Sequence, residues 1–319
     1  MLLFSFITTV QAYAAGTKET VVVGEVIPSF GKDAYAYELL DRVSAGSAYP
    51  SMQGLALGGG KAYVLKYGTQ LNKTNKKNEE MCVLFSGKTT NLIRGKDGLK
   101  LGHGNDMTYR KLDGKLYVAP MNQKYIIRMR TDGTVEAKIK TNFMVGSIAC
   151  WLDYDKAHNK DAFVLKEHKN GKIHVMEIYG TTSKEICQFE VDDALNQGIC
   201  MYDGYLYVTE WDKENGDSYI YRIEKKMSTI VKEKGRNGEV WIYKDKKRKY
   251  ITRVIAILDK RRLLKAAGVS GTAIKIEIES IAFSDGYLYF TANANYKDDT
   301  KAKKQHSLDG LYKIKQQLA

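Results

Sequence analysis

The chain has few of the residues that build metal sites, disulfides and linkers. Its 319 residues include only 3 prolines, 4 cysteines and 5 histidines. The cysteines show no CxxC spacing and no paired histidines beside them, which argues against a structural zinc site. No Pro-rich or Ser-rich linker divides the sequence, so we expect one domain rather than two.

The sequence also lacks the common catalytic and nucleic-acid-binding motifs. It contains no GxSxG, HExxH or P-loop pattern. Helix-turn-helix, RRM-like and zinc-finger patterns are missing too, so nucleic acid is not an expected partner. No apolar run is long enough to span a bilayer. We therefore expect no transmembrane segment, no bound metal and no cofactor.

The chain does contain a phrase that it repeats. Each copy has a small or polar pair, an apolar run, a turn, and a strand of alternating aromatic and β-branched residues. The copies begin at Gln53-Gly54, Asn105-Asp106, Gly146-Ser147, Gln197-Gly198 and Glu279-Ser280. Asp-Gly turns, which supply positive φ, join the two strands in several copies. A repeat with a period of tens of residues predicts a repeat architecture.

Four antiparallel strands per copy are typical of β-propeller blades, so the sequence predicts an all-β, five-bladed propeller. Six blades are the alternative, since the long gap between the last two copies has room for another blade around Trp241. A basic insertion in the fourth blade, at about 225–270, is the favoured explanation of that gap. The last blade lacks a fourth strand, and we expect the N-terminal segment Glu19–Val26 to supply it.

The first 14 residues form an apolar segment that ends in the small residues Ala12 and Ala14. This ending suits a secretory signal peptide, although no positive charge precedes the apolar run. A short buried strand is the other interpretation. Export is favoured, so we expect residues 15–319 to form one propeller domain, a monomer that is secreted or associated with the cell wall.

Basic residues outnumber acidic ones and give a formal net charge of +13. They concentrate in loops, above all in the 225–270 insertion, whose Lys246, Lys247 and Arg248 are the predicted contact with an anionic surface. A second loop cluster consists of Lys301, Lys303 and Lys304. For an exported protein the predicted partner is a cell-wall glycan or another anionic polymer. A basic protein whose charges are simply solvated is the alternative.

The residues that open the inner strands are expected to converge at one mouth of the central channel, where convergent polar groups form a ligand site. The predicted ligand-binding residues are Gln53, His103, Asn105, Asp106, Gln197, Glu279, Trp151 and Trp211. His103, Asp106 and Glu279 are also the candidate acid–base groups. The carboxylates of Asp106 and Glu279 would suit a cation in the channel. The alternative is that these side chains only join neighbouring blades by hydrogen bonds.

The cysteines Cys82, Cys150, Cys187 and Cys200 have no spacing that fixes their redox state. Cys150 and Cys200 occupy the same apolar position in two copies, so we expect both to be buried thiols. A disulfide between Cys187 and Cys200 is the alternative, because an outer and an inner strand of adjacent blades would bring them close.

The segment Leu101–Tyr109, with Gln53-Gly54 before it and Glu279–Ala282 and Asp309–Ile314 after it, resembles the helveticin J family. These are secreted, bacteriocin-like proteins of Gram-positive bacteria. The resemblance covers most of the chain in the order of the blades. It implies an exported propeller that acts at bacterial envelopes, and it carries over no catalytic residue.

A looser resemblance is to the five-bladed glutaminyl cyclases of plants, which also open inner strands with a Gln-Gly or Glu-Gly pair. It implies an enzyme with a channel carboxylate such as Glu279; other hydrolase or lyase propellers belong to the same alternative. A protein-interaction scaffold without a small-molecule site is the third functional class.

Overall fold

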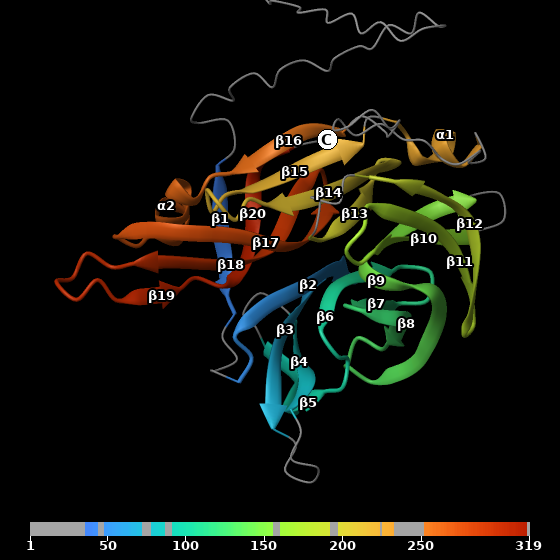
Figure 1. Ribbon diagram of the computed structural model, residues 1–319, viewed down its shortest axis with the longest axis horizontal. Coiled ribbons are helices and arrows are strands. Elements are labelled where there is room, and N and C mark those ends of the chain that lie inside the picture. The colour runs from blue at the N-terminus through green and yellow to red at the C-terminus, as the bar shows by residue number, and fades with distance from the viewer. Residues whose placement is uncertain are drawn as a thin grey trace, which may run out of the picture. The chain divides into compact units, whose positions relative to one another are not determined.

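Antiparallel β-strands form nearly all of the regular structure (Figure 1). The computed structural model describes residues 36–43, 48–71, 78–86, 91–155, 160–191, 197–223, 225–232 and 252–317. All of these residues belong to one unit, Tyr35–Ala319. The predicted all-β class is confirmed. The proposed signal segment, residues 1–14, lies outside the described residues.

In the described part of the chain the strands form four sheets. One contains β2 (Ser51–Gly58), β3 (Lys61–Leu71), β4 (Asn78–Ser86) and β5 (Asn91–Leu99). A seven-stranded sheet contains β6 (Gly104–Arg110), β7 (Lys115–Pro120), β8 (Gln123–Met129), β9 (Val135–Asp155), β10 (Lys160–Glu167), β11 (Lys172–Tyr179) and β12 (Thr182–Glu190). The third contains β13 (Ile199–Tyr202), β14 (Tyr205–Trp211), β15 (Ser218–Ile223) and β16 (Thr252–Leu258). The fourth contains β1 (Tyr37–Arg42), β17 (Thr272–Ser284), β18 (Tyr287–Lys297), β19 (Gln305–Ser307) and β20 (Gly310–Gln317).

The long strand β9 belongs to two groups of strands. Its first part pairs with β8, as in Ala137 opposite Arg128, and its second part pairs with β10, as in Ala149 opposite Val164. The seven-stranded sheet is therefore two four-stranded groups that share β9. We number the strand groups one to five along the chain: β2–β5, β6 to the first part of β9, the second part of β9 to β12, β13–β16, and β17–β18–β20–β1.

Every copy of the repeated phrase forms the predicted hairpin, and the hairpins share one register. The anchor aromatics pair with the first strand as Ala56–Tyr63, Thr108–Tyr117, Cys150–Phe163, Cys200–Tyr207 and Ala282–Tyr289. The Asp-Gly turns have the expected positive φ, with Asp203 at 46° and Gly204 at 76°. A two-residue turn of this kind matches the right-handed twist of the strands that it joins.

The strand that completes the last group is β1, not the segment Glu19–Val26 that the sequence suggested. β20 pairs with β1 on one side and with β18 on the other, so it has no free edge for another strand. Tyr37 fixes the choice of β1: its buried ring packs edge-on against Phe290 and Tyr312, with centroids 5.8 and 6.0 Å away. Glu19–Val26 lies outside the described residues.

The predicted insertion at 225–270 contains regular structure in its described parts. These are α1 (Met227–Lys232), β16, the short 3-10 turn η2 (Lys260–Arg262) and α2 (Leu263–Ala267). β16 pairs with β15 and is the fourth strand of group four. Trp241, Lys246, Lys247 and Arg248 lie outside the described residues. No helix among the described residues is long and apolar enough to cross a membrane.

Five apolar clusters fill the spaces between the strand groups in the described residues. Four of the clusters draw their side chains from two groups that follow each other in sequence, as where Leu65 of group one packs in one cluster with Leu116 of group two. The clusters between groups two and three, three and four, and four and five likewise combine side chains of two successive groups. The fifth cluster joins the first group to the last, through Leu55 and Leu311. Side chains of the first and last groups are therefore in one apolar cluster.

All four cysteines are free thiols. Cys82, Cys150 and Cys200 are buried, and Cys187 is half-buried. The expectation of buried thiols at Cys150 and Cys200 is confirmed, and the alternative disulfide between Cys187 and Cys200 is not formed.

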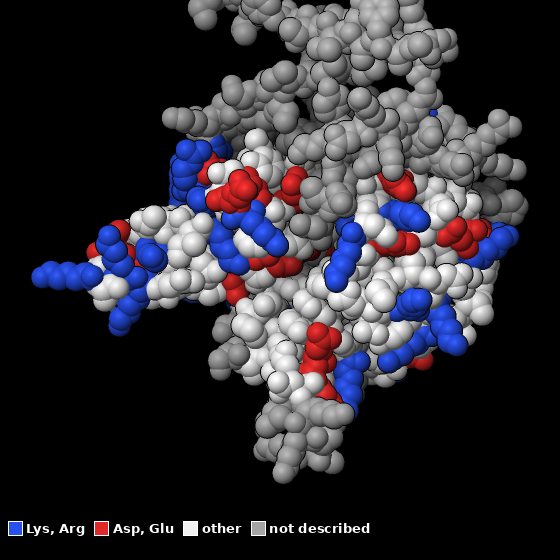
Figure 2. All heavy atoms as spheres, in the orientation of Figure 1, with Lys and Arg blue, Asp and Glu red and all other residues white. Residues whose placement is uncertain are grey.

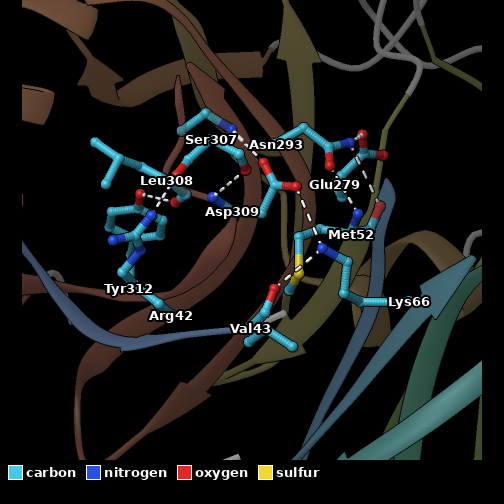
Figure 3. Close-up of polar contacts among 11 residues, drawn as sticks. Arg42, Val43, Met52, Lys66, Glu279, Asn293, Ser307, Leu308, Asp309 and Tyr312 are labelled. Atoms are coloured by element: carbon cyan, nitrogen blue, oxygen red, sulfur yellow. Dashed lines mark hydrogen bonds and ion pairs between the residues drawn. The ribbon is translucent and has the colours of Figure 1, made fainter. Parts of the chain in front are cut away.

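A buried ion pair joins the first strand group to the last, beside the neighbouring strands β1 and β20 (Figure 3). Lys66 on β3 donates through Nζ to the Val43 carbonyl at 3.0 Å, and Nζ lies 3.2 Å from Oδ2 of Asp309. The two charged side chains are only 5% and 10% exposed. Asp309 also accepts from the Ala294 backbone N–H through Oδ1, at 3.1 Å. Val43 follows β1 and Asp309 precedes β20, so this pair fastens the junction at which the chain ends meet the first group.

Removing Asp309 should cost far more stability than removing an exposed partner. Asp309→Ala leaves a buried ammonium without its carboxylate, which should lower the free energy of unfolding by about 3–5 kcal/mol. The matched control is Glu38→Ala, which breaks the exposed pair between Glu38 and Lys315 and should cost about 1 kcal/mol or less. Denaturant unfolding measures both variants, and equal losses would contradict the assignment.

Candidate functional site

The buried carboxylate of Asp106 lies where the first strands of the groups meet. Its side chain is 0% exposed. Oδ1 accepts hydrogen bonds from the Met107 N–H at 2.9 Å and the Ser280 hydroxyl at 2.5 Å. Oδ2 accepts from the N–H groups of Ile148 and Ile199 at 3.0 and 3.3 Å. One side chain on β6 is thus bonded to β9, β13 and β17.

Ser280 extends these contacts to the remaining group. Its hydroxyl accepts from the Leu55 N–H of β2 at 3.0 Å while it donates to Asp106. The two side chains together connect β2, β6, the second part of β9, β13 and β17, which we call the inner strands. Each inner strand also contacts the next, and β17 contacts β2. We call Asp106 and Ser280 the hub.

In two copies the second member of the pair is glycine, because the inner strands approach one another closely there. A Cβ atom on Gly54 would lie 2.8 Å from Cβ of Met107, and one on Gly198 would lie 2.6 Å from Cα of Ser280. Pairing with the next strand is also irregular at the pair in four copies. Such bulges re-aim side chains and backbone groups, here toward the hub.

The first member of each pair precedes the hub position along its inner strand, and we call the region around these first members the mouth. Gln53, Asn105 and Glu279 are 4–5% exposed, and Gln197 is half-buried. Asn105 donates through Nδ2 to the Gly146 carbonyl of the neighbouring group at 2.8 Å. These amides therefore make contacts between groups, as the structural alternative predicted.

His103 and Gln53 meet across the junction of groups one and two. Nε2 of His103 lies 3.2 Å from Oε1 of Gln53, and the imidazole stacks on Tyr67 with centroids 3.9 Å apart. Burial lowers the pKa of His103 below its ordinary value. The ring is consequently neutral at neutral pH, with one donor and one acceptor nitrogen.

Glu279 is the most strongly perturbed acid of the mouth. Burial and the neighbouring carboxylate of Glu277 raise the pKa of Glu279 well above its ordinary value. Asn293 donates to its Oε1, and the backbone N–H of Met52 donates to the Asn293 Oδ1 at 2.7 Å (Figure 3). A carboxyl group with a raised pKa keeps its proton to higher pH, which suits it to act as a proton donor.

Glu277 connects Glu279 to a second part of the mouth. Gln197 donates through Nε2 to Oε1 of Glu277 at 3.4 Å, and Lys275 Nζ lies 2.6 Å from its Oε2. Lys275 also lies over the ring of Trp211, 4.9 Å from the centroid. The Trp211 indole N–H is buried and has no acceptor among the described residues. An N–H in this state is suited to an acceptor brought by a ligand.

The two predicted tryptophans have different surroundings. Trp211 ends β14 and is half-buried at the mouth. Trp151 is 7% exposed and belongs to the apolar cluster between groups three and four, where it packs edge-on against Tyr154 at 5.0 Å. We assign Trp151 to the core.

Asp106 was also a predicted ligand-binding residue. Its two carboxylate oxygens accept four hydrogen bonds from the protein, so we assign Asp106 to the hub.

Sequence reasoning missed Lys275, Glu277 and Asn293, whereas Tyr67 was expected, with Trp151 and Trp211, to suit stacking on a sugar. The signal for two of them was present, because Lys275 and Glu277 precede Glu279 at alternate positions, and alternate residues of a strand share a face. Asn293 lies on a second strand, where no pattern set it apart. Among the described residues, no three His, Cys, Asp or Glu side chains gather in a way that would hold a metal ion.

Comparison with known proteins assigns no family, because no family model and no curated protein sequence matches. Solved structures with a similar backbone include one from a nidogen/laminin complex, at 13% identity and a TM-score of 0.41, covering 83% of each chain. A glucose dehydrogenase is 11% identical, with a TM-score of 0.41 and 86% and 85% coverage. A catalytically inactive virginiamycin B lyase of Staphylococcus aureus is 14% identical, with a TM-score of 0.38 and 88% and 99% coverage. These similarities concern the backbone alone, so a function can be inferred only from the residues of the site described above.

The hub should give the protein a characteristic dependence of stability on pH. Burial raises the pKa of Asp106 to about 7, and its hydrogen-bond donors oppose the rise. An unfolded aspartate has a pKa of about 3.9. The folded state binds this proton more tightly, so the stability that Asp106 contributes is full below about pH 4 and is lost as the pH rises through 7.

Asp106→Asn removes this titration. The free energy of unfolding of the wild type, minus that of Asp106→Asn, should fall by up to about 4 kcal/mol between pH 4 and pH 8. Parallel denaturant titrations of the two proteins measure the difference, in which the contribution of Glu279 cancels. A difference that is constant or rises with pH would show that Asp106 is already ionised in the folded protein at low pH.

Proposed function

We propose that the chain is a five-bladed β-propeller whose mouth binds a glycan. The blade count is supported by the five strand groups, the five apolar clusters that join them in a cycle, and the hub that links the five inner strands. A sixth blade between β15 and β17 is disfavoured, since β16 already belongs to group four.

The observation that carries the binding proposal is the buried, unpartnered indole N–H of Trp211 beside the Gln197–Glu277–Lys275 contacts. Amides, a neutral imidazole and a carboxylic acid offer both donors and acceptors, which match sugar hydroxyls. An indole adds an apolar face and a donor at one edge. The proposed ligand is a glycan of the bacterial envelope, and the protein would be exported and bacteriocin-like.

A second contact with an anionic wall polymer is proposed for the exposed basic loops. Lys301, Lys303 and Lys304 are exposed on the connection between β18 and β19, and Figure 2 shows basic side chains at that end of the molecule. Asp298 orders the connection, since its Oδ1 accepts from the Lys304 N–H at 3.0 Å. Lys246, Lys247 and Arg248 belong to the same proposal but lie outside the described residues.

Binding to purified cell wall tests the two contacts separately. Trp211→Ala should raise the dissociation constant by about tenfold or more, as for a tryptophan at the centre of an interface. Replacing Lys301, Lys303 and Lys304 by serine should instead flatten the salt dependence of binding, because salt screens exposed charges. Tyr179→Ala, which removes an exposed aromatic of β11, is the control and should change neither. If the wild-type protein does not bind purified cell wall, the proposal is wrong.

An enzyme in the channel is the second candidate function, and the raised pKa of Glu279 beside Glu277 favours it. In this case Glu279 is the general acid, and activity falls as the pH rises through its pKa. Glu279→Gln should abolish turnover and leave the fold intact. Glu277→Gln should shift the alkaline limb of the pH profile to lower pH, because it removes the neighbouring negative charge.

Glycans and peptides with N-terminal glutamine are the substrates to assay, which covers hydrolase, lyase and glutaminyl-cyclase chemistry. Activity retained in Glu279→Gln would exclude Glu279 as the acid. An alkaline limb that does not move in Glu277→Gln would exclude the coupling between the two carboxyl groups.

A further inference from the structure

A hollow lies at the other end of β13 from Gln197. It has a volume of about 410 Å³ and is lined by Tyr202, Asp203, Tyr205, Tyr207 and Arg222. These residues come from the end of β13, the turn after it, β14 and β15. None of them belongs to the mouth, so a ligand here would bind independently of the proposed glycan.

The aromatic wall of this hollow is supported from behind by the next strand group. Tyr202 is half-buried and stacks on Phe283 of β17, with centroids 4.5 Å apart and an angle of 20° between the rings. Tyr207 is 1% exposed and packs against the same Phe283 at 4.6 Å. Rings held in this way lose little conformational freedom when a ligand packs on them, which favours binding.

Two cationic side chains lie on the ring of Tyr205. Cζ of Arg222 is 4.7 Å from the ring centroid, and Nζ of Lys226 is 5.2 Å from it. The carboxylate of Asp203 lies 3.9 Å from Lys226 Nζ. Burial raises the pKa of Tyr207 to about 12, so its hydroxyl is neutral. The described residues at the hollow thus carry two positive charges and one negative charge.

We propose that this hollow binds a sugar acid, a pyranose-sized ring that carries one carboxylate. A guanidinium has five N–H donors in a planar fork, and the fork matches a carboxylate. Tyr202 and Tyr205, which are half-buried, supply ring faces for the C–H groups of the sugar and hydroxyls for its O–H groups. The volume is within the range of small-molecule sites, about 300–1,000 Å³.

Titration of the full chain with glucuronate, glucose and acetate tests this assignment. Glucuronate should bind saturably, followed by NMR or calorimetry, and glucose and acetate should bind at least tenfold more weakly because each lacks half of the recognised groups. Arg222→Gln should weaken glucuronate binding at least tenfold, and Arg222→Lys should weaken it less. Trp211→Ala, at the mouth, should leave it unchanged.

Tyr202→Leu provides a second variant, since it removes the stacking face and keeps an apolar side chain against Phe283. It should also weaken glucuronate binding at least tenfold, so the proposal is testable even where Arg222→Gln does not fold. The absence of saturable glucuronate binding would overturn the proposal, as would equal affinity for glucose. Loss of binding in Trp211→Ala would place the ligand at the mouth instead.

Discussion

The structure depends on how the inner edges of its strand groups satisfy their backbone N–H groups around one buried carboxylate. An inner strand has a partner on one side only, so some of its N–H groups face the centre of the unit. Asp106 accepts two such groups from Ile148 and Ile199, and Ser280 accepts a third from Leu55. A buried charge is costly unless it is hydrogen-bonded, and an unpaired buried N–H is costly as well. The hub reduces both costs together, although burial still raises the pKa of Asp106 to about 7.

Other features of the chain follow from the space that the hub requires. Gly54 and Gly198 have no side chain because neighbouring backbone atoms occupy the position of a Cβ. The closing junction meets a different requirement, since it must hold two chain ends rather than one continuous strand. There Lys66 bonds to Val43 and Asp309, which flank β1 and β20. A buried pair breaks at a high cost when one partner is lost, so it fastens this junction more strongly than exposed pairs would.

The sequence predicted the parts of the fold that are local and repeated. Period-two alternation and Asp-Gly turns determine each hairpin, and the common register of Tyr63 and Tyr289 follows from them. The edge strand was mispredicted because strand propensity depends on context. The run Glu19–Val26 is rich in β-branched residues, whereas Tyr37–Arg42 is selected by ring packing and by a hydrogen bond from the Tyr37 hydroxyl to the Asp259 carbonyl at 2.8 Å. Contacts between distant residues such as these leave no local pattern.

The polar pair itself was only half understood from the sequence, because its two members have different roles. Its location was evident, but the chain alone did not show that Asp106 bonds at the hub while Asn105 bonds to Gly146 at the junction of two groups. The same division separates Glu279 from Ser280, whose hydroxyl is fixed by Asp106 and Leu55. Ser280 directly follows Glu279, and its two hydrogen bonds restrain the backbone that carries the Glu279 carboxyl group. The hub therefore pre-organises the mouth, and the first member of each pair can vary in chemistry while the frame that positions it stays constant.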